Sequence, residues 1–149
     1  MQEFSYSDEG VALTKSFEGL RLEAYQDCAG VWTVGYGHTG PGIAEGMTVN
    51  DAEAEVLLRS DLEEAVRCVN RRVTEKIVQS QFDAMVDFCF NVGRRNFLQS
   101  TLLRKVNFGD FAGAEAQFGL WVHAGGAVVA GLVRRRKAEA ELFQAMVIQ

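Results

Sequence analysis

The sequence lacks any apolar run of the about 18 residues that a membrane-spanning helix requires. Its amino-terminal segment, MQEFSYSDEG, contains no basic stretch followed by an apolar core, so we expect neither a secretory signal nor stable membrane insertion. Proline is also scarce, with one residue in 149, whereas 15 glycines are spread along the chain. This composition is typical of a compact protein with glycine turns and excludes a low-complexity chain.

Cysteine and histidine are scarce as well. The three cysteines, Cys28, Cys68 and Cys89, lack the paired spacing of a disulfide framework, which fits synthesis in a reducing cytoplasm. We interpret Cys68 and Cys89 as buried apolar side chains of helices. The only histidines are His38 and His123, and no HExxH spacing is present, so we expect neither a metal nor another cofactor.

Charge is unevenly distributed, although the formal net charge is only −5. The first 66 residues are strongly acidic and the remainder is net basic, which fits either an enzyme oriented at an anionic polymer or two halves that attract each other. The basic cluster Arg134–Lys137 has two interpretations of equal weight. It contacts an anionic surface, or it is a solvated helix face with i, i+4 ion pairs. Because the whole chain is acidic and lacks a nucleic-acid-binding motif, we expect no nucleic-acid partner.

The local patterns near the amino terminus predict one helix and one small hairpin. Ser7 or Asp8 is a suitable N-cap for a first helix, and Gly19 a suitable end. Aromatic and β-branched residues follow from residue 20 to residue 38. They are interrupted by the turn-forming residues 27–30, which predicts a β-hairpin with Asp27 at its tip.

A long helix is expected after a glycine-rich loop. Residues 48–51 (TVND) match a capping box, and apolar residues keep a helical period from about residue 49 to about residue 70. Such a helix is about 30 Å long and can join two lobes. We therefore expect an α+β fold with one domain over residues 1–149, divided into a small lobe at about 1–48 and a helical lobe at about 71–149.

Two carboxylates occupy contrasting positions in the amino-terminal part. Glu18 ends the first helix, where the negative end of the helix dipole and partial burial disfavour its ionisation. Asp27 lies in a turn near backbone N–H groups, which favour its ionised form. One protonated and one ionised carboxyl are what the hydrolysis of a glycosidic bond requires. Thr33 follows on the returning strand.

These residues stand in the pattern EGLRL…Y.D..G..T.G.GHT, which is followed in order by FDAMVDFCFNVG, STLLRKVN, WVHAGG and GLVRRRKAEAELF. The pattern resembles the phage-type lysozymes (glycoside hydrolase family 24), in particular the endolysins of lambdoid and related tailed phages. The resemblance covers nearly the whole chain. It implies a lysozyme-like fold and cleavage of the β-1,4 bond between N-acetylmuramic acid and N-acetylglucosamine in peptidoglycan, without a cofactor.

The resemblance also implies a role for each residue. Glu18 corresponds to the general acid, Asp27 to the carboxylate that stabilises charge or activates water, and Thr33 to a residue that positions this water. It implies inversion, for which the two carboxyl groups stand about 6.5–9.5 Å apart. We further expect Trp32, His38 and Trp121 to contact substrate.

The expected biology follows from this function and from the missing secretory signal. We expect a monomer that accumulates in the host cytoplasm, leaves through a holin pore and acts in the periplasm on glycan strands. Two alternatives remain open at this point. One is a lytic transglycosylase, and the other is a non-catalytic peptidoglycan-binding or lysis-regulating protein. A redox role of Cys28, next to Asp27, is also open.

Overall fold

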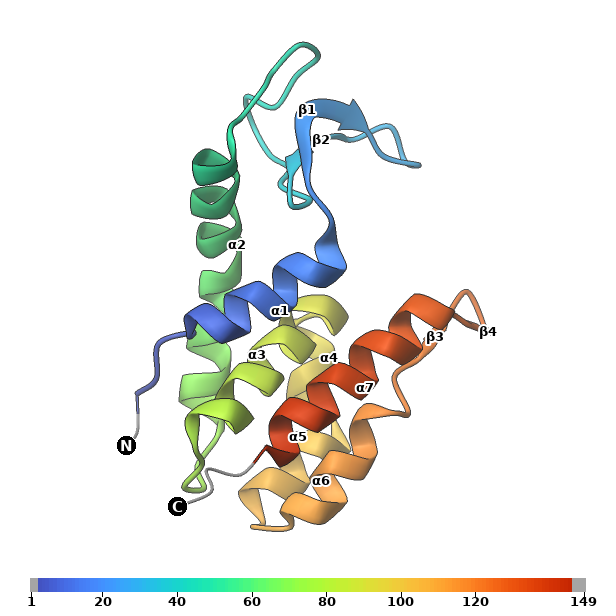
Figure 1. Cartoon of the computed structure of the whole chain (residues 1–149). Helices are drawn as coiled ribbons and strands as arrows, with labels where there is room; N and C mark the ends of the chain where they lie inside the picture. The colour runs from blue at the N-terminus through green and yellow to red at the C-terminus, as the bar shows by residue number, and fades with distance from the viewer. Residues whose placement is uncertain (1–2, 146–149) are drawn as a thin grey trace. The chain divides into compact units, whose positions relative to one another are not determined.

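The computed structural model describes residues 3–145, which form two compact units (Figure 1). One unit is Val11–Glu63, and the other combines the described residues up to Gly10 with those from Glu64 onward. Two small two-stranded sheets accompany a mostly helical body, which confirms the predicted α+β class. The lobe limits near residues 48 and 71 stay predictions.

The first helix, α1 (Asp8–Glu18), begins and ends as predicted. Ser7 caps it, because its hydroxyl oxygen accepts a hydrogen bond from the Gly10 N–H at 3.1 Å. Gly19 follows the last helical residue with a φ of +72°, a left-handed conformation that glycine adopts at little cost. Glu18 is therefore fixed at the helix end.

The predicted hairpin consists of β1 (Arg21–Gln26) and β2 (Trp32–Gly35), which lie beside the amino-terminal half of α2 (Figure 1). The strands are antiparallel, and Tyr25 lies opposite Thr33. The other edge of β1 bonds to a third segment, since the Ala24 N–H donates to the Met47 carbonyl at 2.8 Å. Four buried residues form the small core between these strands and α2: Ala24, Val34, Val49 and Ala54.

The long helix α2 spans Asp51–Arg72, close to the predicted range. Its capping box differs from the predicted one at residues 48–51. The Asn50 side chain accepts from the Glu53 N–H at 2.8 Å, and the Glu53 carboxylate accepts from the Asn50 N–H at 2.9 Å. Asn50 is thus the N-cap, because the acid that completes the box stands three residues after it and not three after Thr48.

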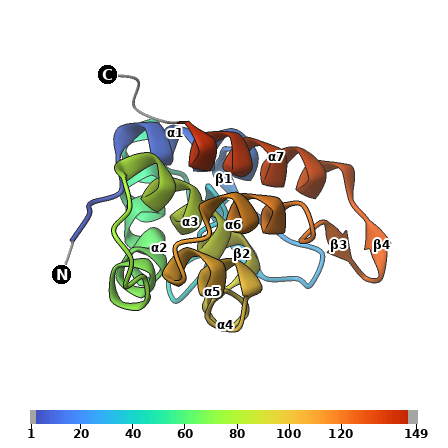
Figure 2. The ribbon, with the colours of Figure 1, turned by 90° about the horizontal axis from the view of Figure 1, so that it is seen from below.

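The second unit is built mainly from helices (Figure 2). Helix α7 packs against α3 and α6, and α5 packs against α6. The β3–β4 hairpin, which the sequence patterns did not predict, extends from the amino-terminal end of α7 in both views. The elements are α3 (Gln79–Val92), α4 (Arg94–Leu98), α5 (Thr101–Asn107), α6 (Phe111–Phe118), β3 (His123–Ala124), β4 (Ala127–Val128) and α7 (Ala130–Gln144).

Aromatic side chains fill the core of this second unit. The Phe88 ring makes edge contacts with Phe97, Phe118 and Trp121 at centroid distances of 6.3, 5.4 and 5.5 Å. Cys68 and Cys89 are buried as predicted, and burial raises the pKa of both thiols. Within residues 3–145, no helix has the length and apolar character needed to cross a membrane.

Candidate active site

The Glu18 carboxylate faces a tight turn at the end of β2, on the side of the hairpin opposite to the Asp27 turn. This turn, residues 35–37, is called the glycine turn below. A Cβ atom added to Gly37 would lie 3.7 Å from Glu18 Oε1, which places the carboxylate directly over that residue. Glu18 is half-buried, so the carboxylate combines partial shelter with access to solvent.

Hydrogen bonds and packing hold the glycine turn in place. Val34 and His38 exchange two backbone hydrogen bonds of 2.9 Å across its base. Gly35 and Gly37 have φ angles of +70° and +89°, a region that favours glycine. A Cβ on Gly35 would lie 3.5 Å from Ala54 Cβ, so the turn packs closely on α2.

Asp27 lies in the turn between β1 and β2, as predicted. Its Oδ1 atom accepts hydrogen bonds from the backbone N–H groups of Ala29 at 2.8 Å and Val31 at 2.9 Å. The Oδ2 atom has no hydrogen bond to any residue in the range 3–145 and remains available to solvent or substrate. Two backbone donors give this carboxylate a fixed orientation.

Thr33 is tied to the same turn through a shared acceptor. The Val31 carbonyl accepts from the Thr33 hydroxyl at 2.9 Å and from the Asp27 N–H at 2.9 Å. Thr33 is only 4% exposed, and its hydroxyl oxygen can still accept a hydrogen bond. The structure thus places Glu18, Asp27 and Thr33 around one hairpin.

The structure gives Trp32 and His38 contacts within the same unit. Trp32 is half-buried and packs against the small core. His38 Nδ1 lies 3.0 and 2.9 Å from the two carboxylate oxygens of Asp61 in α2. Sequence reasoning missed Asp61 as the partner of His38, because the two residues are 23 positions apart and no local pattern links them.

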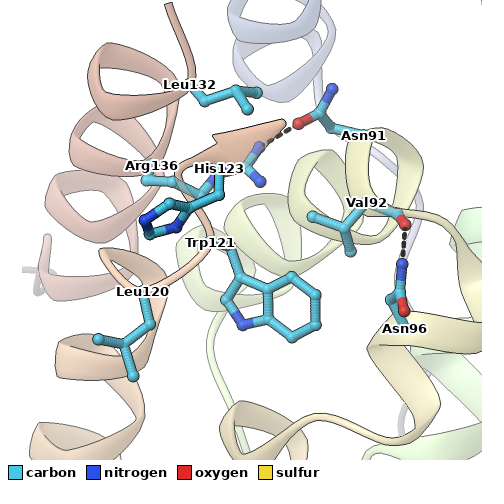
Figure 3. Close-up of a pocket in the computed structure, with 8 residues that line it drawn as sticks. All are labelled: Asn91, Val92, Asn96, Leu120, Trp121, His123, Leu132 and Arg136. Atoms are coloured by element: carbon cyan, nitrogen blue, oxygen red, sulfur yellow. Dashed lines mark hydrogen bonds between the residues drawn. The ribbon is translucent and has the colours of Figure 1, made fainter. Parts of the chain in front are cut away.

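Trp121 lines a pocket of about 310 Å³ in the other unit (Figure 3). Its indole and the Arg136 guanidinium face the same space, and Arg136 donates to Asn91 Oδ1 at 2.6 Å. Arg136 Nη1 has no hydrogen-bond partner in the part of the chain that the structure describes. The sequence patterns singled out only His123 among the other lining residues. These are Val92, Asn96, Leu120, His123 and Leu132.

The basic cluster Arg134–Lys137 is not one solvated face, because its two central residues are buried, but the expected i, i+4 ion pair between Arg135 and Glu139 is present at 3.9 Å. Arg135 is 4% exposed and Arg136 is 1% exposed. Arg135 binds both carboxylate oxygens of Asp87 at 2.9 Å, and Arg136 Nε lies 2.7 Å from Glu139 Oε1. Only the first and last residues of the cluster are exposed.

Burial shifts the titration of this ionic cluster. It raises the pKa of Glu139 well above its ordinary value, and the hydrogen bond to Asp87 adds to this, whereas Arg136 and Arg135 oppose it. Burial also lowers the pKa of Arg136. In the described chain, no group of three His, Cys, Asp or Glu side chains is arranged to hold a metal ion.

Known proteins share this sequence and this fold. The sequence model of the family described as phage lysozyme matches residues 15–139. An endolysin of Acyrthosiphon pisum secondary endosymbiont phage 1 is 41% identical over 142 residues, which are 93% of this chain and 97% of that endolysin. An endolysin of Bacillus phage B103 is 42% identical over 139 residues, which are 92% of this chain but 53% of that protein, so the chain spans about half its length.

A solved structure extends the likeness to three dimensions. The muramidase domain of SpmX from Asticaccaulis excentricus matches with a TM-score of 0.90 and 43% sequence identity. The match covers 97% of this chain and 100% of that one. The predicted lysozyme-like fold is therefore confirmed.

Proposed function

Because the chain belongs to the phage lysozyme family and is a lysozyme-type enzyme that cleaves peptidoglycan, we propose that it is an endolysin with muramidase activity. It hydrolyses the β-1,4 bond between N-acetylmuramic acid and N-acetylglucosamine. The observation that carries the proposal is the position of the Glu18 carboxylate over the glycine turn of the hairpin that also holds Asp27 and Thr33.

The three residues have separate tasks in this proposal. Glu18 donates its proton to the glycosidic oxygen, so that the bond to the anomeric carbon breaks and the leaving sugar carries a hydroxyl. Water attacks the anomeric carbon and loses a proton toward Asp27, whose Oδ1 is held by two backbone donors while Oδ2 is available. The Thr33 oxygen accepts a hydrogen bond from this water.

The stereochemical outcome follows from the space that water needs. Inversion requires the two carboxyl groups to stand about 6.5–9.5 Å apart, so that a water molecule fits on the face opposite the leaving group. We propose inversion because the two carboxyls come from a helix end and from the far turn of the hairpin.

We propose that Trp32, His38 and Trp121 contact the substrate, in different ways. Trp32 adjoins Thr33 in β2 and presents an aromatic surface to a sugar. His38 ends the glycine turn, and its hydrogen bond to Asp61 orients the ring for contact with the substrate. The pocket at Trp121 offers the aromatic ring of its indole to a sugar.

The setting of the reaction is proposed on the same basis. The chain acts as a monomer and as one lysozyme domain comprising both compact units. It accumulates in the host cytoplasm, passes the membrane through a holin pore, and lyses the cell from the periplasm. Detection of the protein outside the membrane in cells without any pore protein would contradict this route.

The experiment that tests the function compares the wild type with Glu18→Gln on permeabilised Gram-negative cells. We expect a loss of turbidity with the wild type alone, together with released muropeptides that carry a reducing end. Anhydro-sugar products would instead establish a lytic transglycosylase. Wall binding by both proteins without release of sugars would establish a binding or regulatory protein.

A further inference from the structure

Lys15 joins three segments around the proposed acid. It lies one helical turn before Glu18 in α1. Its ammonium group forms an ion pair with the Glu55 carboxylate of α2. The same ammonium lies 5.7 Å from the centre of the Tyr36 ring, which belongs to the glycine turn. Lys15 thus connects the end of α1 both to α2 and to the turn that faces Glu18.

Glu55 and its neighbour complete this connection. Glu55 follows Ala54, the residue on which Gly35 of the glycine turn packs. Its second oxygen, Oε2, accepts from Arg59 Nε at 3.0 Å, so each carboxylate oxygen has its own cationic partner. The α2 side of the contact is therefore anchored within its own helix, and Lys15 of α1 reaches across to it.

The charge states suit a lasting ion pair. The hydrogen bond to Glu55 raises the pKa of Lys15, and the hydrogen bonds from Lys15 and then Arg59 lower the pKa of Glu55. Both partners remain about one-third exposed, at 30% and 35% of their side chains. Exposed ion pairs contribute little to global stability, so an effect of this pair is expected in local geometry.

We propose that Lys15 is a positioning residue for the hydrolysis, which fixes the Glu18 carboxyl relative to the glycine turn through Glu55 and Tyr36. Residues three apart on a helix lie on the same face, so Lys15 anchors the turn of α1 that carries Glu18. A catalytic group acts efficiently only when it is held within about 0.5 Å of its productive position. The inference rests on the proposed role of Glu18 as the general acid.

The test uses steady-state kinetics on soluble peptidoglycan fragments, with the melting temperature of each variant as a measure of folding. Lys15→Met keeps the apolar stem and removes the charge, and Glu55→Gln removes the partner charge. Lys15→Arg is the conservative variant. Lys105→Met is the matched control, because the Lys105 ammonium also pairs with an exposed carboxylate, that of Asp110 at 3.4 Å.

We expect kcat to fall about tenfold in Lys15→Met and in Glu55→Gln, with KM unchanged within about twofold. The double variant should lose no more than Lys15→Met alone, since Lys15→Met already removes the contact with Glu55. Lys15→Arg should recover most of the lost kcat, and Lys105→Met should match the wild type. Melting temperatures should stay within about 2 °C of the wild type, as for other exposed ion pairs.

Three results would overturn the inference. They are a wild-type kcat in Lys15→Met, a raised KM at unchanged kcat, or an equal loss in the Lys105→Met control. A failure of the proposed function can be distinguished from these three results. If Glu18→Gln retained wild-type turnover, the assignment of the acid itself would be wrong, whereas an inactive Glu18→Gln beside an unimpaired Lys15→Met would reject only the positioning role.

Discussion

At the scale of single residues, different interactions hold each of the proposed catalytic side chains in place. Asp27 is fixed by two backbone N–H donors, and Thr33 by a hydrogen bond to the Val31 carbonyl. Glu18 instead depends on the end of α1 and on the glycine turn beneath its carboxylate. Substitutions at Asp27 and at the glycine turn therefore test different aspects of the site.

Asp27→Asn should remove activity without unfolding the protein. The amide oxygen can still accept from the N–H groups of Ala29 and Val31, so the turn keeps its conformation, but the negative charge is lost. We expect kcat to fall by roughly 10²–10⁴-fold, the usual contribution of a general base. The measurement is kcat on soluble glycan together with the melting temperature, and retention of wild-type kcat would exclude Asp27 from the reaction.

Gly37→Ala should impair both stability and turnover. Its φ of +89° is unfavourable for alanine, at a cost of roughly 1–2 kcal/mol. The new methyl group would lie 3.7 Å from Glu18 Oε1, in space that solvent or substrate needs. We expect a lower kcat in addition to the loss of stability measured by urea unfolding.

Gly46→Ala is the matched control for this substitution. Gly46 has a similar φ of +85°, and a Cβ there would meet no atom within 4 Å. It should lose comparable stability and keep its kcat. An equal loss of kcat in the two variants would show that strain alone, and not proximity to Glu18, lowers turnover.

At the scale of elements, local signals determined most of what the sequence could predict. The N-cap at Ser7, the glycine after Glu18 and the turn at Asp27 all act within a few residues, and the structure confirms each of them. The capping box of α2 was placed two residues too early, because several polar residues near Asn50 compete for that position.

Features that depend on distant partners were not predictable. The β3 and β4 strands have two residues each, too few for an alternating pattern. Arg135 looked solvated because its buried partner, Asp87, lies 48 residues away in sequence. The same limit applies to the pocket at Trp121, whose lining comes from α3, α4, β3, α7 and the loop between α6 and β3.

Ser100→Ala should destabilise the second unit through the start of α5. The Ser100 hydroxyl accepts from the Leu103 N–H at 3.1 Å and donates to the Phe97 carbonyl at 2.7 Å. Loss of an N-cap costs about 1 kcal/mol, and burial of Ser100 prevents water from replacing either bond. Urea unfolding should show this decrease, and an unchanged midpoint would contradict the capping role.

At the scale of the whole molecule, the buried ionic cluster links stability to pH. The raised pKa of Glu139 means that the folded protein retains this proton more strongly than the unfolded chain. The resulting stabilisation is fully present when the pH is below the ordinary pKa of a glutamate carboxyl. It is lost as the pH rises through the raised pKa of Glu139 in the folded protein. Burial is the first cause of this shift, and Asp87 reinforces it.

The variant Glu139→Gln isolates this effect, because its side chain cannot titrate. We expect the stability of the wild type relative to this variant to be greatest at acidic pH and to decrease as the pH rises. The measurement is the free energy of unfolding in urea at each pH. A margin that is constant, or that widens with pH, would contradict a raised pKa for Glu139.

In the proposed reaction, Glu18 drives the addition of water to a peptidoglycan glycosidic bond. The most direct test of this role is mass analysis of fragments released in water enriched in a heavy oxygen isotope, with wild type and Glu18→Gln compared at equal concentration. We expect one solvent oxygen at the new reducing end for each bond that the wild type cleaves, and no fragments from the variant. Unlabelled anhydro products, or labelled products from both proteins, would contradict it.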